Sequence, residues 1–208
     1  MVSSMYDNSP EETVKDEQVT EENQLESTVG NKKLKEELNL VCGYRFSPYD
    51  YELIVYFLLR KILGMQLPVN IIPEIDLYHY DADQLPISEF KYGMPGEAYF
   101  FTHTERRYAS GSLLKRTTNT GFWKASGVDA KIVHKKRVIG LKKTMVFYWG
   151  KAPAGVKSSW IMHEYRVNPN LFPQAEQDKS LKTKLESYVV CRIRKKNKDS
   201  KAKVPEEG

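Results

Sequence analysis

The sequence predicts an α+β fold in which a twisted antiparallel β-sheet is flanked by a few helices. The first observation is a series of β-branched and aromatic runs, separated by turn residues, that extends from Ala98 to Ile193. The second is the lack of a helical pattern between these runs, which favours an antiparallel sheet over alternating strands and helices. The third is one amphipathic helical segment that precedes them, between Ser47 and Leu63.

Length and cysteine content indicate a single intracellular domain with tails. The 208 residues can form one ordinary domain of roughly 150 residues with its own hydrophobic core. Cys42 and Cys191 lack the spacing of a zinc site or a disulfide framework, which suits a reducing compartment. No apolar run reaches the roughly 18 residues of a membrane span, and the acidic start is unlike a signal peptide. We expect a soluble protein that is not secreted and has no membrane partner.

The charge of the chain changes sign along the sequence. The formal net charge is +5, but residues 1–40 carry −6 and residues 41–100 carry −4. Residues 101–160 carry +11 and residues 161–208 carry +4. A basic block in a part of the chain that also shows strand patterns is expected of a phosphate-binding surface. The alternative is a merely solvated basic surface, and charge alone does not separate the two.

The two ends of the chain lack the apolar residues that a fold needs. Residues 1–38 are rich in Glu, Ser, Asn, Gln and Thr, so burial cannot offset the entropy lost on ordering. We therefore expect a disordered acidic extension at residues 1–38, a folded domain at residues 39–193 and a disordered basic tail at residues 194–208.

A helix is predicted to begin at Ser47 and to end near Leu63. Ser47 suits the N-cap, Pro48 suits the first helical position, and Asp50 lies favourably near the positive end of the helix dipole. Gly64 follows as a left-handed C-cap. The apolar residues recur at spacings of three and four and should form one buried stripe, which comprises Leu53, Ile54, Phe57, Leu58 and Ile62.

Turns and then strands are predicted for the rest of the domain. Prolines between Pro68 and Pro86 break the chain, so residues 71–86 should form extended segments and turns with at most a brief helix. About six strands should follow, at residues 98–102, 121–125, 136–141, 144–149, 159–167 and 187–193.

The residue types of an active site are present without the spacing that a reaction requires. The four histidines, His79, His103, His134 and His163, form no zinc motif, ligand cluster or nucleophile elbow. His163 and Glu164 are adjacent in a predicted strand, so their side chains should point to opposite faces. No glycine-rich phosphate-binding loop occurs. We therefore expect no enzyme, no metal or other cofactor, and no small-molecule substrate.

Residues 121–125 alternate aromatic, basic and small side chains in a pattern that suits a DNA-binding strand. In a strand, Phe122 and Lys124 share one face while Trp123 and Ala125 take the other. If Trp123 faces the core, Lys124 can reach a phosphate or a base edge, and Phe122 can contact a thymine methyl in the major groove. The alternative is an ordinary strand with one exposed lysine. Phosphate neutralisation by flanking cations favours the binding interpretation, and these cations are Arg107, Arg116, Lys131, Lys135, Lys136 and Arg137.

The chain resembles the NAC domains of plant transcription factors from about Leu40 to Ile193. The resemblance is carried by an ordered set of segments: GYRFSPYDYEL at residues 43–53, LPV at 67–69, EIDLY at 74–78, YFF at 99–101, GFWKASG at 121–127, GLKK at 140–143, VFY at 146–148, GKAP at 150–153 and WIMHEYR at 160–166. It implies the NAC-domain fold, a homodimer or a heterodimer with related NAC proteins, and a nuclear factor that reads double-stranded DNA.

The resemblance also implies roles for individual residues. Arg45 and Glu52 match positions that form reciprocal salt bridges across the dimer, although an intrachain surface pair worth under about 1 kcal/mol is the alternative. Phe122 and Lys124 match the base-reading strand, and Lys151 matches a position near the DNA backbone, as do Arg107 and Arg116. With flanking residues included, the DNA-binding candidates are Arg107, Arg116, Phe122, Trp123, Lys124, Ala125, Ser126, Gly127, Lys131 and Lys151.

Departures from the family pattern affect both expected activities. Near the dimer residues, Val41-Cys42 replaces Pro-Pro, and Tyr49 and Tyr51 replace Thr and Glu. On the DNA side, Phe122, Leu113 and Ala154 replace a tyrosine, an arginine and a lysine. The leading hypothesis is a sequence-specific transcription factor, and the alternative is a short dimerisation partner that sequesters related factors. Two basic clusters suit nuclear import or phosphate contacts, namely residues 135–137 and 192–196.

Overall fold

The structure, a computed structural model, describes Gly43, residues 45–104 and residues 116–196. The chain divides after residue 44 into two units, and every feature described below lies in the second. The disordered extension expected at residues 1–38 lies outside the described residues, as do Arg107, Leu113 and most of the tail.

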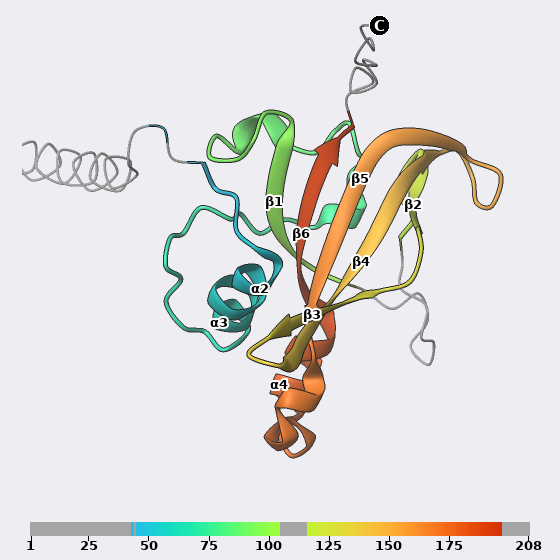
Figure 1. The fold of residues 1–208 in the computed structure, drawn as a ribbon. Helices are drawn as coiled ribbons and strands as arrows, with labels where there is room; N and C mark the ends of the chain where they lie inside the picture. Colours follow the sequence, from blue (N-terminus) through green and yellow to red (C-terminus); the bar gives the residue numbers. More distant parts are fainter. Residues whose placement is uncertain (1–42, 44, 105–115, 197–208) are drawn as a thin grey trace, which may run out of the picture. The chain divides into compact units, whose positions relative to one another are not determined.

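A six-stranded antiparallel sheet forms the centre of the fold, which confirms the predicted fold class (Figure 1). The strand order is β1-β6-β5-β4-β2, and β3 pairs with β4 outside this path. Because β3 pairs with the first half of β4 and β2 with the second half, these two short strands lie one after the other along one edge of β4. The strands are β1 (Glu97–His103), β2 (Gly121–Ala125), β3 (Ala130–His134), β4 (Arg137–Trp149), β5 (Val156–Val167) and β6 (Tyr188–Lys195).

The observed strands differ from the predicted ones in two main ways. The two strands predicted at residues 136–141 and 144–149 are one continuous strand, β4. Gly140 lies within this strand and leaves room for the first helix, because a side chain there would lie 2.9 Å from Cδ1 of Ile54. Strand β3 was not predicted, whereas β2 has the predicted bounds. Strand β6 continues to Lys195, two residues beyond the expected end of the domain.

One helical segment covers residues 50–62 and packs against the sheet (Figure 1). The prediction that Ser47 caps it is wrong, because Tyr49 occupies the N-cap and its backbone N–H donates to Oε2 of Glu52 over 2.8 Å. Gly64 adopts the predicted left-handed conformation, with φ of +67°. The segment comprises α2 (Asp50–Glu52), a π-helical part η1 (Leu53–Leu58) and α3 (Leu59–Ile62), and the predicted stripe Leu53, Ile54, Phe57, Leu58 and Ile62 is buried.

Helix α4 (Lys179–Ser187) was not predicted. Its first turn is capped by Asp178, whose carboxylate accepts hydrogen bonds from the N–H groups of Ser180 and Leu181. No helix in the described residues is long and apolar enough to cross a membrane. The brief helix allowed between residues 71 and 86 is confirmed as η2, and the 3-10 helices are η2 (Leu77–His79), η3 (Ile87–Glu89), η4 (Pro169–Leu171) and η5 (Pro173–Glu176).

Asp50 connects the first helix to the sheet. Its Oδ1 accepts a hydrogen bond from the Tyr165 hydroxyl over 2.8 Å, and its Oδ2 lies 2.5 Å from Nζ of Lys142. Beside this connection, Phe46 packs edge-on against Phe57 and Tyr99, with ring centroids 5.1 and 5.0 Å apart. The core therefore lies between the first helix and one face of the sheet.

Candidate nucleic-acid interface

Strand β2 is fixed to the core by Trp123. This side chain is 2% exposed, and its ring centroid lies 5.2 Å from that of Phe147, its partner in the register of β4. Lys124, the next residue, is exposed. The predicted division of the strand into a core-facing and an outward-facing side is therefore confirmed for Trp123 and Lys124.

Phe122 is not available as the exposed apolar contact that its place in the strand suggested. It is 7% exposed, and its ring stacks on Tyr148 of β4 with centroids 5.5 Å apart. The loop between β4 and β5 covers it, because a side chain added to Gly155 would lie 2.7 Å from Cε1 of Phe122. Phe122 therefore packs against Tyr148 beneath this loop and is not exposed on the face of the strand.

The turn after β2 is exposed and held from both ends. Residues 125–127, Ala125, Ser126 and Gly127, are all exposed. The Ser126 N–H donates to the Thr144 carbonyl over 2.8 Å, and Gly127 has φ of +77°, a conformation that glycine adopts without strain. Beyond the turn, the Lys143 ammonium lies 2.5 Å from Oδ1 of Asp129. The turn therefore presents a defined backbone to solvent.

Residues 116–120 form a short arm that runs along the outer edge of β2 and turns into its first residue. Thr117 pairs with Phe122 in an antiparallel bridge, and the Trp123 N–H donates to the Arg116 carbonyl over 2.8 Å. Arg116, which was expected near the DNA backbone, has an intrachain partner, because its Nη2 lies 3.3 Å from Oε1 of the fully buried Glu164. The charge of Arg116 is therefore paired with a carboxylate inside the protein.

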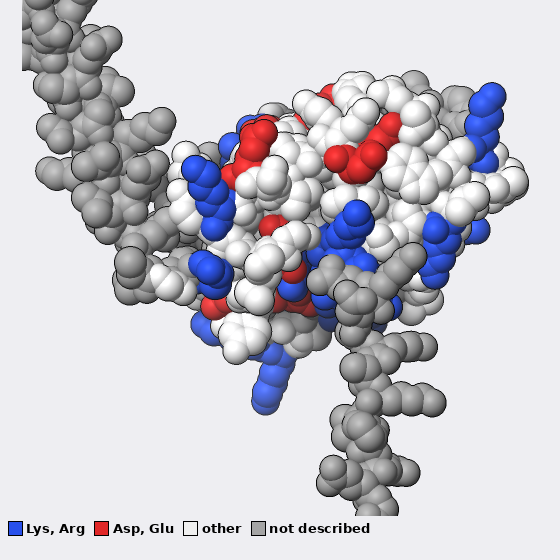
Figure 2. Space-filling model, turned by 90° about the horizontal axis from the view of Figure 1, so that it is seen from above, with Lys and Arg blue, Asp and Glu red and all other residues white. Residues whose placement is uncertain are grey.

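Lys131 and Lys151 remain exposed, as a phosphate-binding role requires. Lys131 lies in β3, and Lys151 lies in the loop between β4 and β5. That loop and the turn after the arm line an open groove of about 570 Å³. Figure 2 shows one face of the molecule, on which Lys and Arg side chains stand at several separate places with Asp and Glu side chains between them.

Glu164 is the centre of a buried polar cluster that the sequence did not reveal. Its carboxylate accepts a hydrogen bond of 2.7 Å from the Tyr78 hydroxyl and one of 2.8 Å from Nε of Arg166, in addition to the contact with Arg116. Burial, and then the charge of Glu164, raise the pKa of Tyr78 well above its usual value. The two guanidinium groups neutralise a carboxylate that would otherwise be costly to bury.

His163 lies on the other side of β5 from Glu164, as the sequence predicted. Burial lowers the pKa of His163 to about 4, with further contributions from the charges of Lys142, Arg194 and Arg192. The two side chains therefore do not form an acid–base pair.

Asp81 is a second buried carboxylate that sequence reasoning missed. It is 2% exposed, and it accepts hydrogen bonds from the Thr118 hydroxyl, from the Thr120 N–H at 3.1 Å and from the Thr120 hydroxyl at 2.7 Å. Burial alone would raise the pKa of Asp81, but these hydrogen bonds outweigh it, so the pKa lies below its usual value. No spacing in the sequence connects Asp81 with the arm, and only the fold brings them together.

Of the two dimer candidates, Arg45 lies in the segment before the first helix and Glu52 lies in the first turn of that helix. Arg45 is exposed, and Glu52 accepts hydrogen bonds from the Tyr49 N–H and, at 3.4 Å, from the Tyr51 hydroxyl. The rings of Tyr49, Tyr51 and His134 form a stack with successive centroids 5.9 and 4.7 Å apart. The two tyrosines that depart from the family pattern thus join the helix start to β3.

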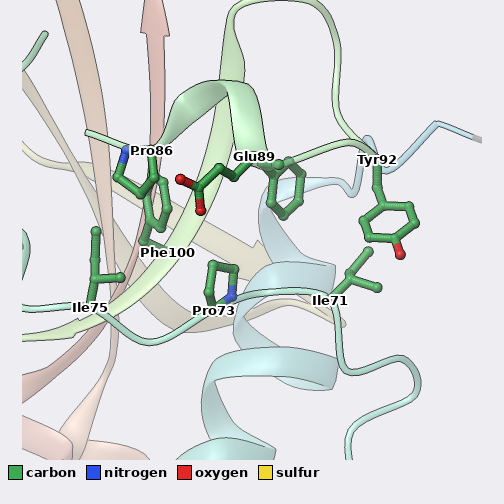
Figure 3. Close-up of a pocket in the computed structure, with 8 residues that line it drawn as sticks. Ile71, Pro73, Ile75, Pro86, Glu89, Tyr92 and Phe100 are labelled. Carbon is green, nitrogen blue, oxygen red and sulfur yellow. The ribbon is translucent and has the colours of Figure 1, made fainter. Parts of the chain in front are cut away.

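Possible metal ligands are not clustered in the part of the chain that the structure describes. No three His, Cys, Asp or Glu residues of this part of the chain are placed to hold a metal ion. A pocket of about 270 Å³ near η3 is mainly apolar, and Figure 3 shows the Glu89 carboxylate among its side chains. Its lining is Ile71, Pro73, Ile75, Pro86, Glu89, Phe90, Tyr92 and Phe100.

Comparison with known proteins places the chain in a family. Residues 41–167 match the family model described as No apical meristem (NAM) protein. The chain is 44% identical to NAC domain-containing protein 68 of Oryza sativa subsp. japonica, over 86% of the chain and 56% of the relative. It is 44% identical to Protein ATAF2 of Arabidopsis thaliana, over 77% of the chain and 55% of the relative. It is 42% identical to NAC transcription factor 29 of Arabidopsis thaliana, over 80% of the chain and 60% of the relative.

The matched part of the chain thus spans little more than half the length of these relatives. The family model covers more than half of the chain, and it includes β2, the arm and the turn after β2. The chain therefore belongs to the NAC-domain family of plant transcription factors.

Proposed function

We propose that this chain binds double-stranded DNA in a sequence-specific manner, acts as a dimer, and regulates transcription in the nucleus. The observation that carries the proposal is the exposure of Lys124 on a strand that is fixed on all other sides. Trp123 anchors the strand to the core, the arm covers its edge, and Phe122 and Tyr148 support its outer face.

The geometry suits a strand that approaches the major groove with Lys124 and the turn after it leading. A lysine can donate to the O6 and N7 acceptors of guanine, and the exposed backbone of residues 125–127 can approach closely because its side chains are small. Lys131 and Lys151 lie on the segments that flank β2 and are assigned to phosphates, where they supply affinity without sequence preference.

The dimer is assigned to the segment around Arg45 and Glu52. In a two-fold dimer Arg45 of one protomer would pair with Glu52 of the other, so two equivalent ion pairs would form. Such pairs set partner choice more than affinity. Glu52 also caps its own helix, so its replacement by Gln is the cleaner test, because Gln retains an oxygen that can accept from the Tyr49 N–H.

The proposal is tested by the oligomeric state and the DNA affinity of the purified protein. We expect a dimer in sedimentation experiments for the wild type, and more monomer for Glu52→Gln. We expect binding of a labelled duplex in fluorescence anisotropy to weaken strongly in Lys124→Ala and to remain unchanged in Lys184→Ala. Lys184 is an exposed lysine of α4, at the opposite end of the sheet from the loop that carries Lys151 (Figure 1).

A second candidate function is that of a dimerisation partner that sequesters related factors and itself binds DNA weakly. It is favoured by two features of the DNA side, the pairing of Arg116 with Glu164 and the neutral Ala154 in the loop between β4 and β5. The two functions separate in a plant-cell reporter assay with a co-expressed NAC relative. Sequestration predicts that Lys124→Ala retains the effect on the reporter and that Arg45→Ala loses it, whereas DNA reading predicts that both variants lose it.

A further inference from the structure

We propose that Asp81 and Glu164 are positioning residues for DNA recognition, because these two buried carboxylates hold the arm at residues 116–120 against the base-reading strand. This inference rests on the proposed function and assigns a role in it to two side chains that need not touch DNA. The arm connects to β2 through a tight turn, so its position and that of β2 depend on each other.

Asp81 holds the far end of the arm. Its carboxylate accepts hydrogen bonds from the side chains of Thr118 and Thr120 and from the backbone N–H of Thr120. Within the turn itself, the Thr118 N–H donates to the Gly121 carbonyl over 2.9 Å. One buried carboxylate therefore fixes the residues from which β2 begins.

The turn that Asp81 holds also positions the loop that carries Lys151. The Thr120 carbonyl accepts a hydrogen bond of 2.7 Å from the Gly150 N–H. A chain of hydrogen bonds therefore leads from Asp81 through Thr120 to the residue next to Lys151. Loss of the carboxylate should loosen both the start of β2 and this phosphate-binding candidate.

Glu164 holds the other end of the arm. The side chain of Arg116 reaches its carboxylate, and the carbonyl of Arg116 accepts the backbone N–H of Trp123. Arg166 and Tyr78 bind the same carboxylate from β5 and η2, which makes Glu164 a rigid support. Each end of the arm thus has a buried carboxylate of its own.

Both carboxylates serve DNA recognition through geometry. A side chain that reads base edges must be held within a fraction of an ångström, and its supporting contacts determine whether it is. If the arm shifts, β2 loses the partner of the Trp123 N–H, and the strand that carries Lys124 gains freedom. Contacts with phosphates tolerate such freedom better, because they depend on charge more than on orientation.

Glu97 provides a matched control in the same sheet. It is 4% exposed, its Oε2 accepts from Nη2 of Arg192 over 2.7 Å, and its Oε1 accepts from the Tyr99 hydroxyl over 3.0 Å. It lies in β1, at the edge of the sheet opposite to β2. Its replacement removes a buried, hydrogen-bonded carboxylate without touching the arm.

The experiment compares wild type, Asp81→Ala, Asp81→Asn, Glu164→Gln and Glu97→Gln. The affinity of each is measured for a duplex that the wild type selects and for an unrelated duplex, and urea unfolding confirms that each variant is folded. Asp81→Ala removes every acceptor for the Thr partners, and Glu164→Gln removes the negative charge that attracts the guanidinium groups of Arg116 and Arg166. We expect both variants to lower the ratio of specific to non-specific affinity about tenfold to a hundredfold. Asp81→Asn retains an acceptor oxygen and should recover most of the ratio, and Glu97→Gln should leave it unchanged.

The outcomes separate this inference from the function on which it rests. A wild type that selects no duplex contradicts the proposed function itself. The positioning role alone is overturned if the wild type is selective and Asp81→Ala, at an equal loss of stability, is as selective as Glu97→Gln. If Glu164→Gln does not fold, the comparison of Asp81→Ala with Asp81→Asn decides, because recovery by Asn supports the role and equal ratios for the two variants overturn it.

Discussion

The ammonium group of Lys124 lies 5.4 Å from the centroid of the Tyr148 ring, which places the candidate base-reading lysine over an aromatic face. The same ring stacks on Phe122. Tyr148 thus contacts both the exposed cation of Lys124 and the buried ring of Phe122. This arrangement restricts the side chain of Lys124 before any ligand is present, which lowers the entropy that binding would cost.

We expect Tyr148→Leu to weaken DNA binding about threefold to tenfold, because leucine preserves apolar cover for Phe122 but removes the contact with the Lys124 ammonium. The free energy of unfolding should fall by about 1 kcal/mol with the loss of ring stacking. Fluorescence anisotropy and urea unfolding measure the two effects. The matched control is Trp160→Leu, which removes the pair of Lys195 and Trp160, at 5.6 Å in β6 and β5. Equal losses of DNA affinity in both variants would contradict the role of Tyr148.

The salt dependence of DNA binding should identify the phosphate contacts. We expect Lys131→Ala and Lys151→Ala each to reduce the slope of log affinity against log salt concentration by about one. Lys184→Ala, on α4, should leave the slope unchanged. The measurement is a series of binding titrations between low and moderate salt. If all three variants have the same slope, Lys131 and Lys151 do not contact phosphates.

The sequence predicted the sheet because its strands are rich in β-branched and aromatic residues, but it did not predict the hairpin of β3 and β4. The two-residue turn of this hairpin consists of Lys135 and Lys136, with φ of 49° and 64°. Turns of this kind usually carry Asn or Gly, which tolerate positive φ, so two lysines gave no turn signal. Strand β3 also has a single buried residue, Ile132, and therefore lacks the alternating pattern of a half-buried strand.

The first helix and Trp123 were predictable because their apolar spacing and flanking residues are local properties of the chain. The buried carboxylates of the candidate site were not. Arg116 meets Glu164, and Asp81 meets Thr118 and Thr120, only in the folded chain, in which β5 pairs with β4 and the arm lies along β2. The pairing of Arg116 with Glu164 therefore could not be predicted from the local sequence around either residue.

The buried position of His163 predicts a pH dependence of stability. Its pKa falls from 6.5 to about 4 on folding, so the unfolded chain binds more protons between these values. The stabilisation by neutral His163 should therefore be fully present above pH 6.5, and the free energy of unfolding should decrease as the pH falls toward 4. The decrease should be about 1 to 3 kcal/mol, because His163 is only partly buried. Urea unfolding at several pH values tests this. His163→Gln should flatten the dependence in this range, and an unchanged pH profile for that variant would exclude His163 as its source.

The carboxylate of Asp50 should contribute strongly to the attachment of the first helix. Asp50→Ala leaves the buried Tyr165 hydroxyl without its acceptor, so the free energy of unfolding should fall by about 2 kcal/mol. Tyr165→Phe removes the donor and should cost about 1 kcal/mol. Because the two residues share one hydrogen bond, the double variant should lose less than the combined single losses. Strictly additive losses would show that the hydrogen bond does not contribute.

Selection of duplexes from a randomised pool by the purified chain, followed by sequencing, tests the central claim most directly. The wild type should yield a defined sequence preference that survives a moderate increase in salt, and Lys124→Ala should yield none while it still folds and still binds DNA weakly at low salt. Weak and salt-sensitive binding without any preference in the wild type would contradict DNA reading by β2, and would favour the alternative in which the chain acts by pairing with related factors.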